Sequence, residues 1–97
     1  MSYADLLRED VRLVILRTLS ELPSYRGNSS VLCTILDQQY GHSVTRDAVK
    51  TELRWLEEQG LIEIDQAGSV LVATLKERGE EVARGRARVD GVKRPGA

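Results

Sequence analysis

The residues in this sequence that are best suited to chemistry are cations spaced along one stretch, residues 43–60. Arg46, Lys50 and Arg54 follow one another at intervals of four residues. Residues four apart lie one above another on a helix, so these side chains can reach out along one flank of it. Arginine and lysine are typical donors to phosphate oxygens and to the edges of guanine bases. The stretch therefore predicts contact with duplex DNA rather than covalent chemistry.

Groups that could support catalysis are few. His42 has no neighbouring cysteine and no paired carboxylates, so we interpret it as a turn or cap residue. Cys33 is the single cysteine, which excludes an intramolecular disulfide and a multi-cysteine metal site and fits a reducing compartment. The sequence also has no phosphate-binding glycine loop and no nucleophile–base signature. We therefore expect no enzyme, no bound metal and no cofactor.

The stretch 43–60 has the pattern of an amphipathic helix. Val49, Leu53 and Leu56 recur at helical spacing and predict one buried stripe. Ser43 or Thr45 can cap the start of this helix, and a glycine at position 60 can end it. The opposite side carries Asp47, Lys50, Thr51, Arg54 and Glu58, with Arg46 at the flank. Such a helix fits the major groove of DNA, although an ordinary core helix with a solvated outer side explains the same pattern.

The remaining elements are expected in a fixed order around this helix. Helical spacing predicts a first helix that Pro23 ends, and a second helix that starts at Asn28 or Ser29. Residues 61–65 and 70–73 predict a β-hairpin, and a capping-box pattern at 74–77 opens a last helix that runs to about residue 83. The expected fold is mainly α with a small β-hairpin, in the order α-α-α-β-β-α, which is a winged helix-turn-helix.

Charge is divided unevenly along the chain, whose formal net charge is −1. From residue 84 onward, five cations accompany one acid, whereas residues 1–83 hold nine cations and fourteen acids. We expect one domain over residues 1–84 and a basic, flexible tail over residues 85–97 that has little to bury. Nucleic acid would attract such a tail and would be repelled by parts of the acidic body.

The residues that we expect to contact DNA come from the third helix, the turn before it and the basic end of the chain. They are Ser43, Thr45, Arg46, Lys50, Thr51, Arg54, Arg84, Arg86, Arg88, Lys93 and Arg94. No apolar run approaches the roughly 18 residues of a membrane span, and the first residues have no signal-peptide pattern. We therefore expect a cytoplasmic protein that does not bind membranes.

Five motifs extend over nearly the whole chain. They are LREDVRLVILRTL (7–19), GHSVTRD (41–47), LRWLEEQGLI (53–62), VATLKERG (72–79) and GRARVDGVKRP (85–95). Together they resemble a family of small winged-helix proteins of Mu-like bacteriophages, and the stretch 53–62 also resembles the recognition helix and first wing strand of ArsR-like and MarR-like regulators. The resemblance implies a phage or prophage transcriptional regulator, and a homodimer formed through the first and last helices.

A second interpretation uses the same fold as a protein–protein interaction module, in phage takeover or packaging, with a phage or host protein as partner. The acidic body favours it, as does an expected wing tip, residues 65–69, that holds no lysine or arginine. Leu6, Leu13 and Leu16 lie off the expected core face of the first helix. They are consistent with a homodimer, or with a large core that covers this helix on several sides.

Overall fold

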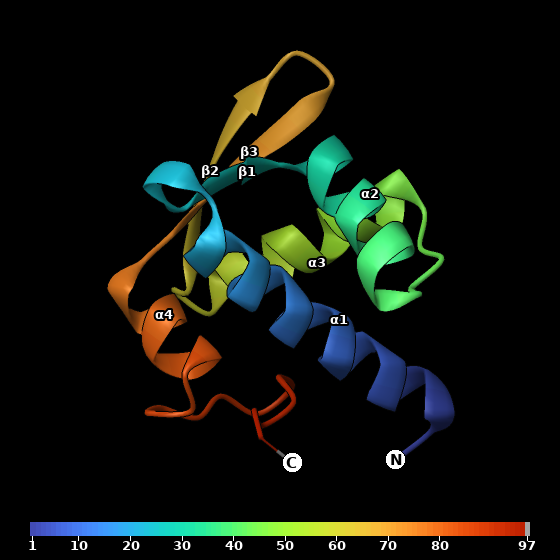
Figure 1. The fold of residues 1–97 in the computed structure, drawn as a ribbon, viewed down its shortest axis with the longest axis vertical. Helices are drawn as coiled ribbons and strands as arrows, with labels where there is room; N and C mark the ends of the chain where they lie inside the picture. The colour runs from blue at the N-terminus through green and yellow to red at the C-terminus, as the bar shows by residue number, and fades with distance from the viewer. Residues whose placement is uncertain (97) are drawn as a thin grey trace.

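The computed structural model describes residues 1–96 as four α-helices and a three-stranded antiparallel sheet (Figure 1). The helices are α1 (Tyr3–Glu21), α2 (Ser29–Tyr40), α3 (Arg46–Glu58) and α4 (Glu77–Ala83). The strands are β1 (Arg26–Asn28), β2 (Ile62–Ala67) and β3 (Val70–Leu75), and a short 3-10 helix, η1 (Pro23–Tyr25), precedes β1. The four expected helices and the expected hairpin are therefore present, within a mixed α/β fold that has one additional strand.

The additional strand is β1, which the sequence pattern did not predict. It pairs with β3 on the side opposite β2, so the strand order is β1-β3-β2, and Gly27 lies across from Ala73. A strand of three residues inside a turn-rich loop is too short to show alternation. A Cβ atom on Gly27 would lie 2.8 Å from Leu22 Cδ1, so a larger residue here would require the Leu22 side chain to shift. Pairing with a distant strand, rather than local propensity, makes this segment extended.

Most of the helices start beside a residue whose side chain caps the first turn. At the start of α1 the Ser2 hydroxyl accepts a hydrogen bond from Asp5 N–H, while Ser2 N–H donates to the Asp5 carboxylate and lowers the pKa of that group. Asn28 caps α2 as expected. The capping box expected at Thr74 is wrong, because this residue belongs to β3 and no side chain caps α4. Here sheet pairing prevailed over a local helix signal.

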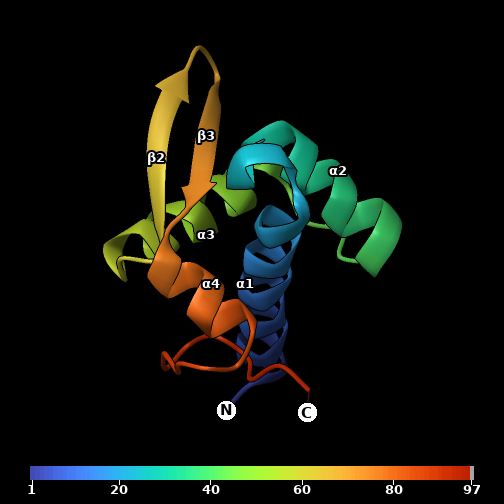
Figure 2. The ribbon, with the colours of Figure 1, turned by 60° about the vertical axis from the view of Figure 1, so that its left-hand side comes forward.

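Helix α1 lies at the centre of the molecule, with α2 and α4 on opposite sides of it and α3 behind (Figures 1 and 2). Leu13 and Leu16, which were expected off the core face, are only 2% and 0% exposed. That expectation is wrong, because helices and the sheet pack around α1 from several directions. Only Leu6 of the three remains outside, at 52% exposed. The two buried leucines therefore give no support to a dimer.

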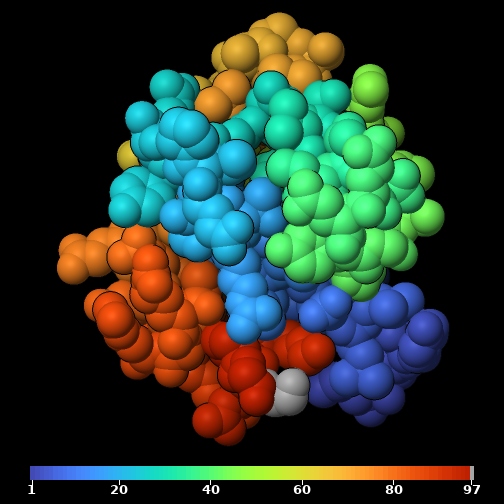
Figure 3. Space-filling model, viewed as in Figure 1, coloured from blue at the N-terminus to red at the C-terminus, as the bar shows by residue number. Residues whose placement is uncertain are grey.

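Residues 85–96 are packed against the helices. Val89 and Val92 are 9% and 6% exposed and belong to the core, and Lys93 N–H donates to the Glu9 carbonyl oxygen at 3.2 Å. Figure 3 shows this segment between α4 and the first turns of α1. The expectation that it has little to bury is wrong, because two valines three residues apart supply an apolar face. The packed core therefore extends beyond residue 84.

The contact of α4 with the residue before β2 and with the end of β3 provides a test of the fold. A Cβ atom on Gly79 would clash with the backbone oxygen of Leu61 and would lie 2.6 Å from Leu75 Cδ1. Because a backbone atom cannot move aside cheaply, Gly79→Ala should lower the free energy of unfolding by about 1–3 kcal/mol, despite the higher helix propensity of alanine. Urea denaturation followed by circular dichroism measures this. The neighbouring exposed substitution Arg78→Ala is the control and should change stability by less than about 0.5 kcal/mol.

Candidate nucleic-acid interface

Helix α3 is held in place by one apolar stripe. Val49, Leu53 and Leu56 are fully buried, as their spacing predicted, and the Thr45 hydroxyl accepts a hydrogen bond from Ala48 N–H at 3.0 Å to cap the first turn. With this stripe turned inward, the opposite side of the helix faces outward. Arg46 and Arg54, two turns apart on the helix, are both exposed. They are the α3 cations best placed to contact a ligand.

Lys50 was expected to be an exposed contact residue, and the structure places it differently. The residue is half-buried, and its Nζ donates a hydrogen bond to the Ser69 carbonyl oxygen at 2.6 Å. Ser69 lies in the turn between β2 and β3, so the lysine joins α3 to the tip of the hairpin. An ammonium group has three donors, and two of these remain for other acceptors. Lys50 therefore fixes the hairpin against the helix as well as adding charge.

The hydroxyl groups among the residues expected to contact DNA already form hydrogen bonds with neighbouring residues. Thr51 donates to the Asp47 carbonyl oxygen at 3.0 Å, and Ser43 donates to the Asp37 carboxylate at 3.3 Å. Thr45 uses its oxygen as an acceptor and keeps its proton free to donate. A phosphate needs donors, so Ser43 and Thr51 would have to break a bond to serve it. The expected hydroxyl contacts are thus secondary to the arginines.

Sequence reasoning missed an acidic residue on the inner side of α3. Glu52 is 9% exposed, and its carboxylate accepts from Arg12 Nε at 2.7 Å and lies 3.5 Å from Arg8 Nε. The spacing contained a signal for it, because Glu52 follows Val49 by three residues and precedes Leu56 by four, which places it on the buried stripe. A glutamate there needs a partner inside the fold, and Arg12 of α1 supplies it.

The Arg12 guanidinium also holds the C-terminal segment. Its carbon lies 3.8 Å from the centre of the Trp55 ring, and one of its terminal nitrogens donates to the Gly91 carbonyl oxygen at 3.0 Å. Gly91 lies against the indole so closely that a Cβ atom would be 2.7 Å from the ring. Trp55 therefore packs against the central helix through Arg12. Glu52 and Trp55 of α3 hold the Arg12 guanidinium, and Arg12 in turn fixes the path of residues 85–96.

A second cluster forms around Asp10 of α1. Its two carboxylate oxygens lie 2.7 Å from His42 Nε2 and 3.5 Å from Lys93 Nζ. His42 is in the turn between α2 and α3, so this carboxylate connects that turn and the C-terminal segment to the central helix. The interpretation of His42 as a turn residue agrees with this position. Cys33 also has a hydrogen-bond partner, because its thiol donates to the Val44 carbonyl oxygen at 3.2 Å.

The five cations expected in a tail differ in their surroundings. Lys93 pairs with Asp10, and Arg84 Nε lies 3.8 Å from Glu80 one turn earlier in α4. The other three are exposed, and no carboxylate of residues 1–96 lies within ion-pair distance of them. These three are Arg86, Arg88 and Arg94. The structure therefore places these basic residues on a folded segment beside α4 (Figure 3).

Other kinds of site find no support in the described part of the chain. Within residues 1–96, no group of three potential metal ligands is found close together. No helix in this range is both long enough and apolar enough to cross a membrane. What remains is a small mixed α/β protein that displays cations on one helix face and on its C-terminal segment.

Comparison with known proteins then places the chain in a family. It is 50% identical over 91 residues to the uncharacterized protein gp26 of Escherichia phage Mu, a match that covers 94% of this chain and 93% of gp26. It is 46% identical over 79 residues to an uncharacterized protein of Haemophilus influenzae, covering 80% of this chain and 76% of that protein. No protein-family profile matches the chain. The chain therefore belongs to the family of phage Mu gp26.

The buried carboxylate of α3 generates a prediction about stability. Glu52→Ala removes the carboxylate that pairs with the Arg12 guanidinium. Water cannot readily replace it, because the Arg12 side chain is only 12% exposed. The loss of one partner from a buried pair should lower the free energy of unfolding by about 3 kcal/mol. Chemical denaturation followed by circular dichroism measures it. Glu58→Ala, at an exposed position of the same helix, should change stability by under about 0.5 kcal/mol, and an equal effect of both variants would contradict the structural role of Glu52.

Proposed function

We propose that this protein is a winged helix-turn-helix protein that binds duplex DNA through the outer face of α3, as a regulator of phage transcription in the bacterial cytoplasm. The observation that carries the proposal is the pair Arg46 and Arg54, exposed two turns apart on a helix whose other side is fully buried. Their separation along the helix axis is about 12 Å, which lets both reach the same groove and its phosphates. Neither residue is held by an ion pair within residues 1–96.

The order of elements supports the same proposal. Helices α2 and α3 are joined by a short turn, and α3 leads directly into the β2–β3 hairpin, as in a helix-turn-helix followed by a wing. Figure 2 shows the hairpin extending past the helices. The bond from Lys50 to Ser69 holds this hairpin to α3, so the helix and the hairpin would meet DNA as one surface. The tip itself is neutral or acidic, so it would position the protein through backbone groups rather than through cations.

Electrostatics limits how strongly one copy can bind. Asp47 and Glu58 are exposed on α3 and oppose phosphate, which offsets part of the attraction from Arg46 and Arg54. Each cation that neutralises a phosphate contributes through counterion release, and typical specific binders use several such contacts. Two copies on one DNA site would double the number. A homodimer is therefore part of the proposal.

A test of the DNA interface uses a charge-matched control. Arg46→Ala with Arg54→Ala should weaken binding to mixed-sequence duplex DNA and reduce the slope of log K against log salt by up to about 2 for each chain bound. Where an arginine contacts a base, a further loss of about 1–3 kcal/mol is expected on a specific site. Fluorescence anisotropy at several salt concentrations measures both quantities.

The control removes two exposed arginines from other helices, Arg17→Ala with Arg78→Ala. This variant has the same net charge as the first, so it isolates the position of the charge from its amount. DNA binding should be nearly unchanged in it. Equal losses in the two variants would mean that α3 makes no particular contact and that only overall charge matters.

The second candidate function, a protein-interaction module, is favoured by an apolar region at the start of α1. Met1, Tyr3 and Leu6 are all more than half exposed. Beside them a hollow of about 430 Å³ lies between the first turns of α1, the turn before α3 and the start of α3, with Leu7 and Val44 in its lining. Clustered exposed apolar side chains of this kind mark interaction surfaces.

The same surface is where we propose the homodimer contact. The outer side of α4 is charged, so the dimer contact is proposed at the start of α1 rather than through the last helix.

Self-association at this surface is directly measurable. At micromolar concentration the mass in light scattering should be about twice the 10.8 kDa of the chain. Leu6→Ser removes apolar area from an exposed position and should shift the mass toward the monomer while leaving the fold intact. A monomeric mass for the unmodified protein would contradict the homodimer and leave the surface for a different protein.

A further inference from the structure

We propose that the folded C-terminal segment, residues 85–95, contains a preformed site for a single phosphate group. A hollow of about 160 Å³ lies within this segment, and its lining includes four cations, Arg86, Arg88, Lys93 and Arg94. Its apolar lining consists mainly of valines and Pro95, and no acidic residue takes part in it. This inference does not depend on the proposed contact between α3 and DNA.

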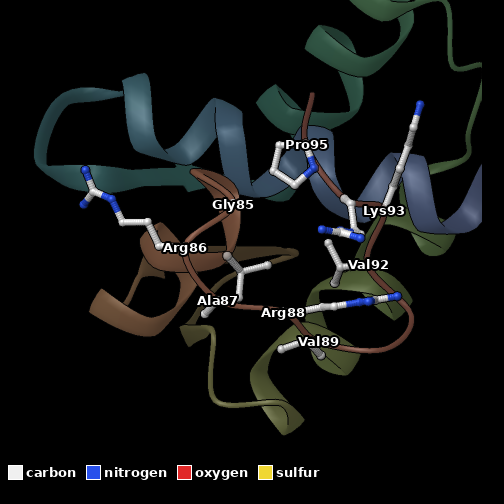
Figure 4. Close-up of a pocket in the computed structure, with 10 residues that line it drawn as sticks. Gly85, Arg86, Ala87, Arg88, Val89, Val92, Lys93 and Pro95 are labelled. Carbon is white, nitrogen blue, oxygen red and sulfur yellow. The ribbon is translucent and has the colours of Figure 1, made fainter. Parts of the chain in front are cut away.

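The size and charge of the hollow point to the group that it would take. It is smaller than the roughly 300–1,000 Å³ of pockets that enclose drug-sized ligands, so it suits one chemical group rather than a whole cofactor. Figure 4 shows Arg88 and Lys93 extending from one side of the loop, with Val92 between them, while Arg86 points the other way. Guanidinium groups match the oxygens of phosphate in charge and in geometry, and more than one cation favours a dianion over a carboxylate.

The conformation of the loop is fixed before any ligand arrives. Val89 and Val92 are buried, Arg12 holds the Gly91 carbonyl oxygen at 3.0 Å, and Lys93 N–H is bonded to α1. Gly85 and Gly91 have φ angles of 79° and 99°, which other residues rarely adopt. A cation cluster on such a frame loses less conformational entropy on binding than a flexible arm would.

The folded segment leaves most of its positive charge uncompensated. Arg86, Arg88 and Arg94 have no carboxylate of residues 1–96 within 4 Å, and Lys93 shares Asp10 with His42. The folded segment therefore leaves the charge of the three arginines without an ion pair among residues 1–96. A bound anion would offset this charge and stabilise the folded segment.

The experiment titrates inorganic phosphate into the full-length protein and follows the backbone amides by NMR, with sodium acetate at the same ionic strength as the control anion. The amides of residues 85–95 should shift in a saturable manner with phosphate, with half-saturation on the order of 1 mM, and should respond little to acetate. Absence of a saturable shift, or an equal response to both anions, would overturn the proposal.

Three variants locate the effect. Arg88→Gln with Arg94→Gln should weaken phosphate binding by at least about tenfold, because two charged donors are lost. Arg84→Gln removes an exposed cation that does not line the hollow and should leave the affinity nearly unchanged. Gly91→Ala keeps every cation but places a Cβ atom against Trp55, so it should also abolish saturable binding. Persistence of the phosphate response in the double arginine variant or in Gly91→Ala would overturn the preformed site.

A further arm identifies where the phosphate comes from. Duplex DNA is titrated into the protein at low and saturating phosphate, with ionic strength held constant. If the hollow receives a backbone phosphate, free phosphate should compete and lower DNA affinity, and Arg88→Gln with Arg94→Gln should remove the competition. If DNA affinity is unaffected while phosphate still binds, the ligand is a free phosphate or a small phosphate ester. The Arg46 and Arg54 variants separate this outcome from a failure of α3 to bind DNA.

Discussion

The arrangement of the molecule depends on one guanidinium, that of Arg12 on the central helix. It makes a salt bridge to Glu52, lies over the Trp55 ring and donates to the Gly91 carbonyl oxygen. Only arginine can do all three, because its planar group offers several donors at its edge and a flat face for stacking. The contacts reach two residues of α3 and the C-terminal segment at once. The inner side of α3 and the path of residues 85–96 are therefore set by the same group.

This constraint also determines where charge is available. Residues 1–83 hold more acids than cations, but they repel an anion less than this excess suggests. Two of the acids, Glu52 and Asp10, form ion pairs with cations inside the fold. The exposed charged residues of α3 are two arginines and three acids: Arg46, Arg54, Asp47, Glu57 and Glu58. Local placement, more than net charge, would therefore decide how strongly the proposed DNA-binding face attracts nucleic acid. A mixed face of this kind suits binding that needs a second copy or a specific site.

The family relationship and the structure describe the same unit. The match to phage Mu gp26 covers nearly the whole of both chains, and the structure shows why the C-terminal segment belongs with the rest. Val89 and Val92 complete the core beside α4, and Gly91 closes over Trp55. The segment therefore contributes stability, and it also carries the exposed cations Arg86, Arg88 and Arg94. Structure and candidate binding surface are combined in the same dozen residues.

The sequence by itself determined the helices, the hairpin and the buried stripe of α3. These features depend on spacing within a few residues of the chain, as for Val49, Leu53 and Leu56, and on local capping by Asn28 and Thr45. Tertiary structure decided what depends on distant partners. Strand β1 forms because β3 lies beside it, and Lys50 is hydrogen-bonded because the hairpin turn lies near it. The C-terminal segment is folded because Arg12 donates a hydrogen bond to Gly91 and Trp55 packs against it. Local patterns hold no information about such contacts, since each joins residues that are far apart along the chain and near one another only after folding.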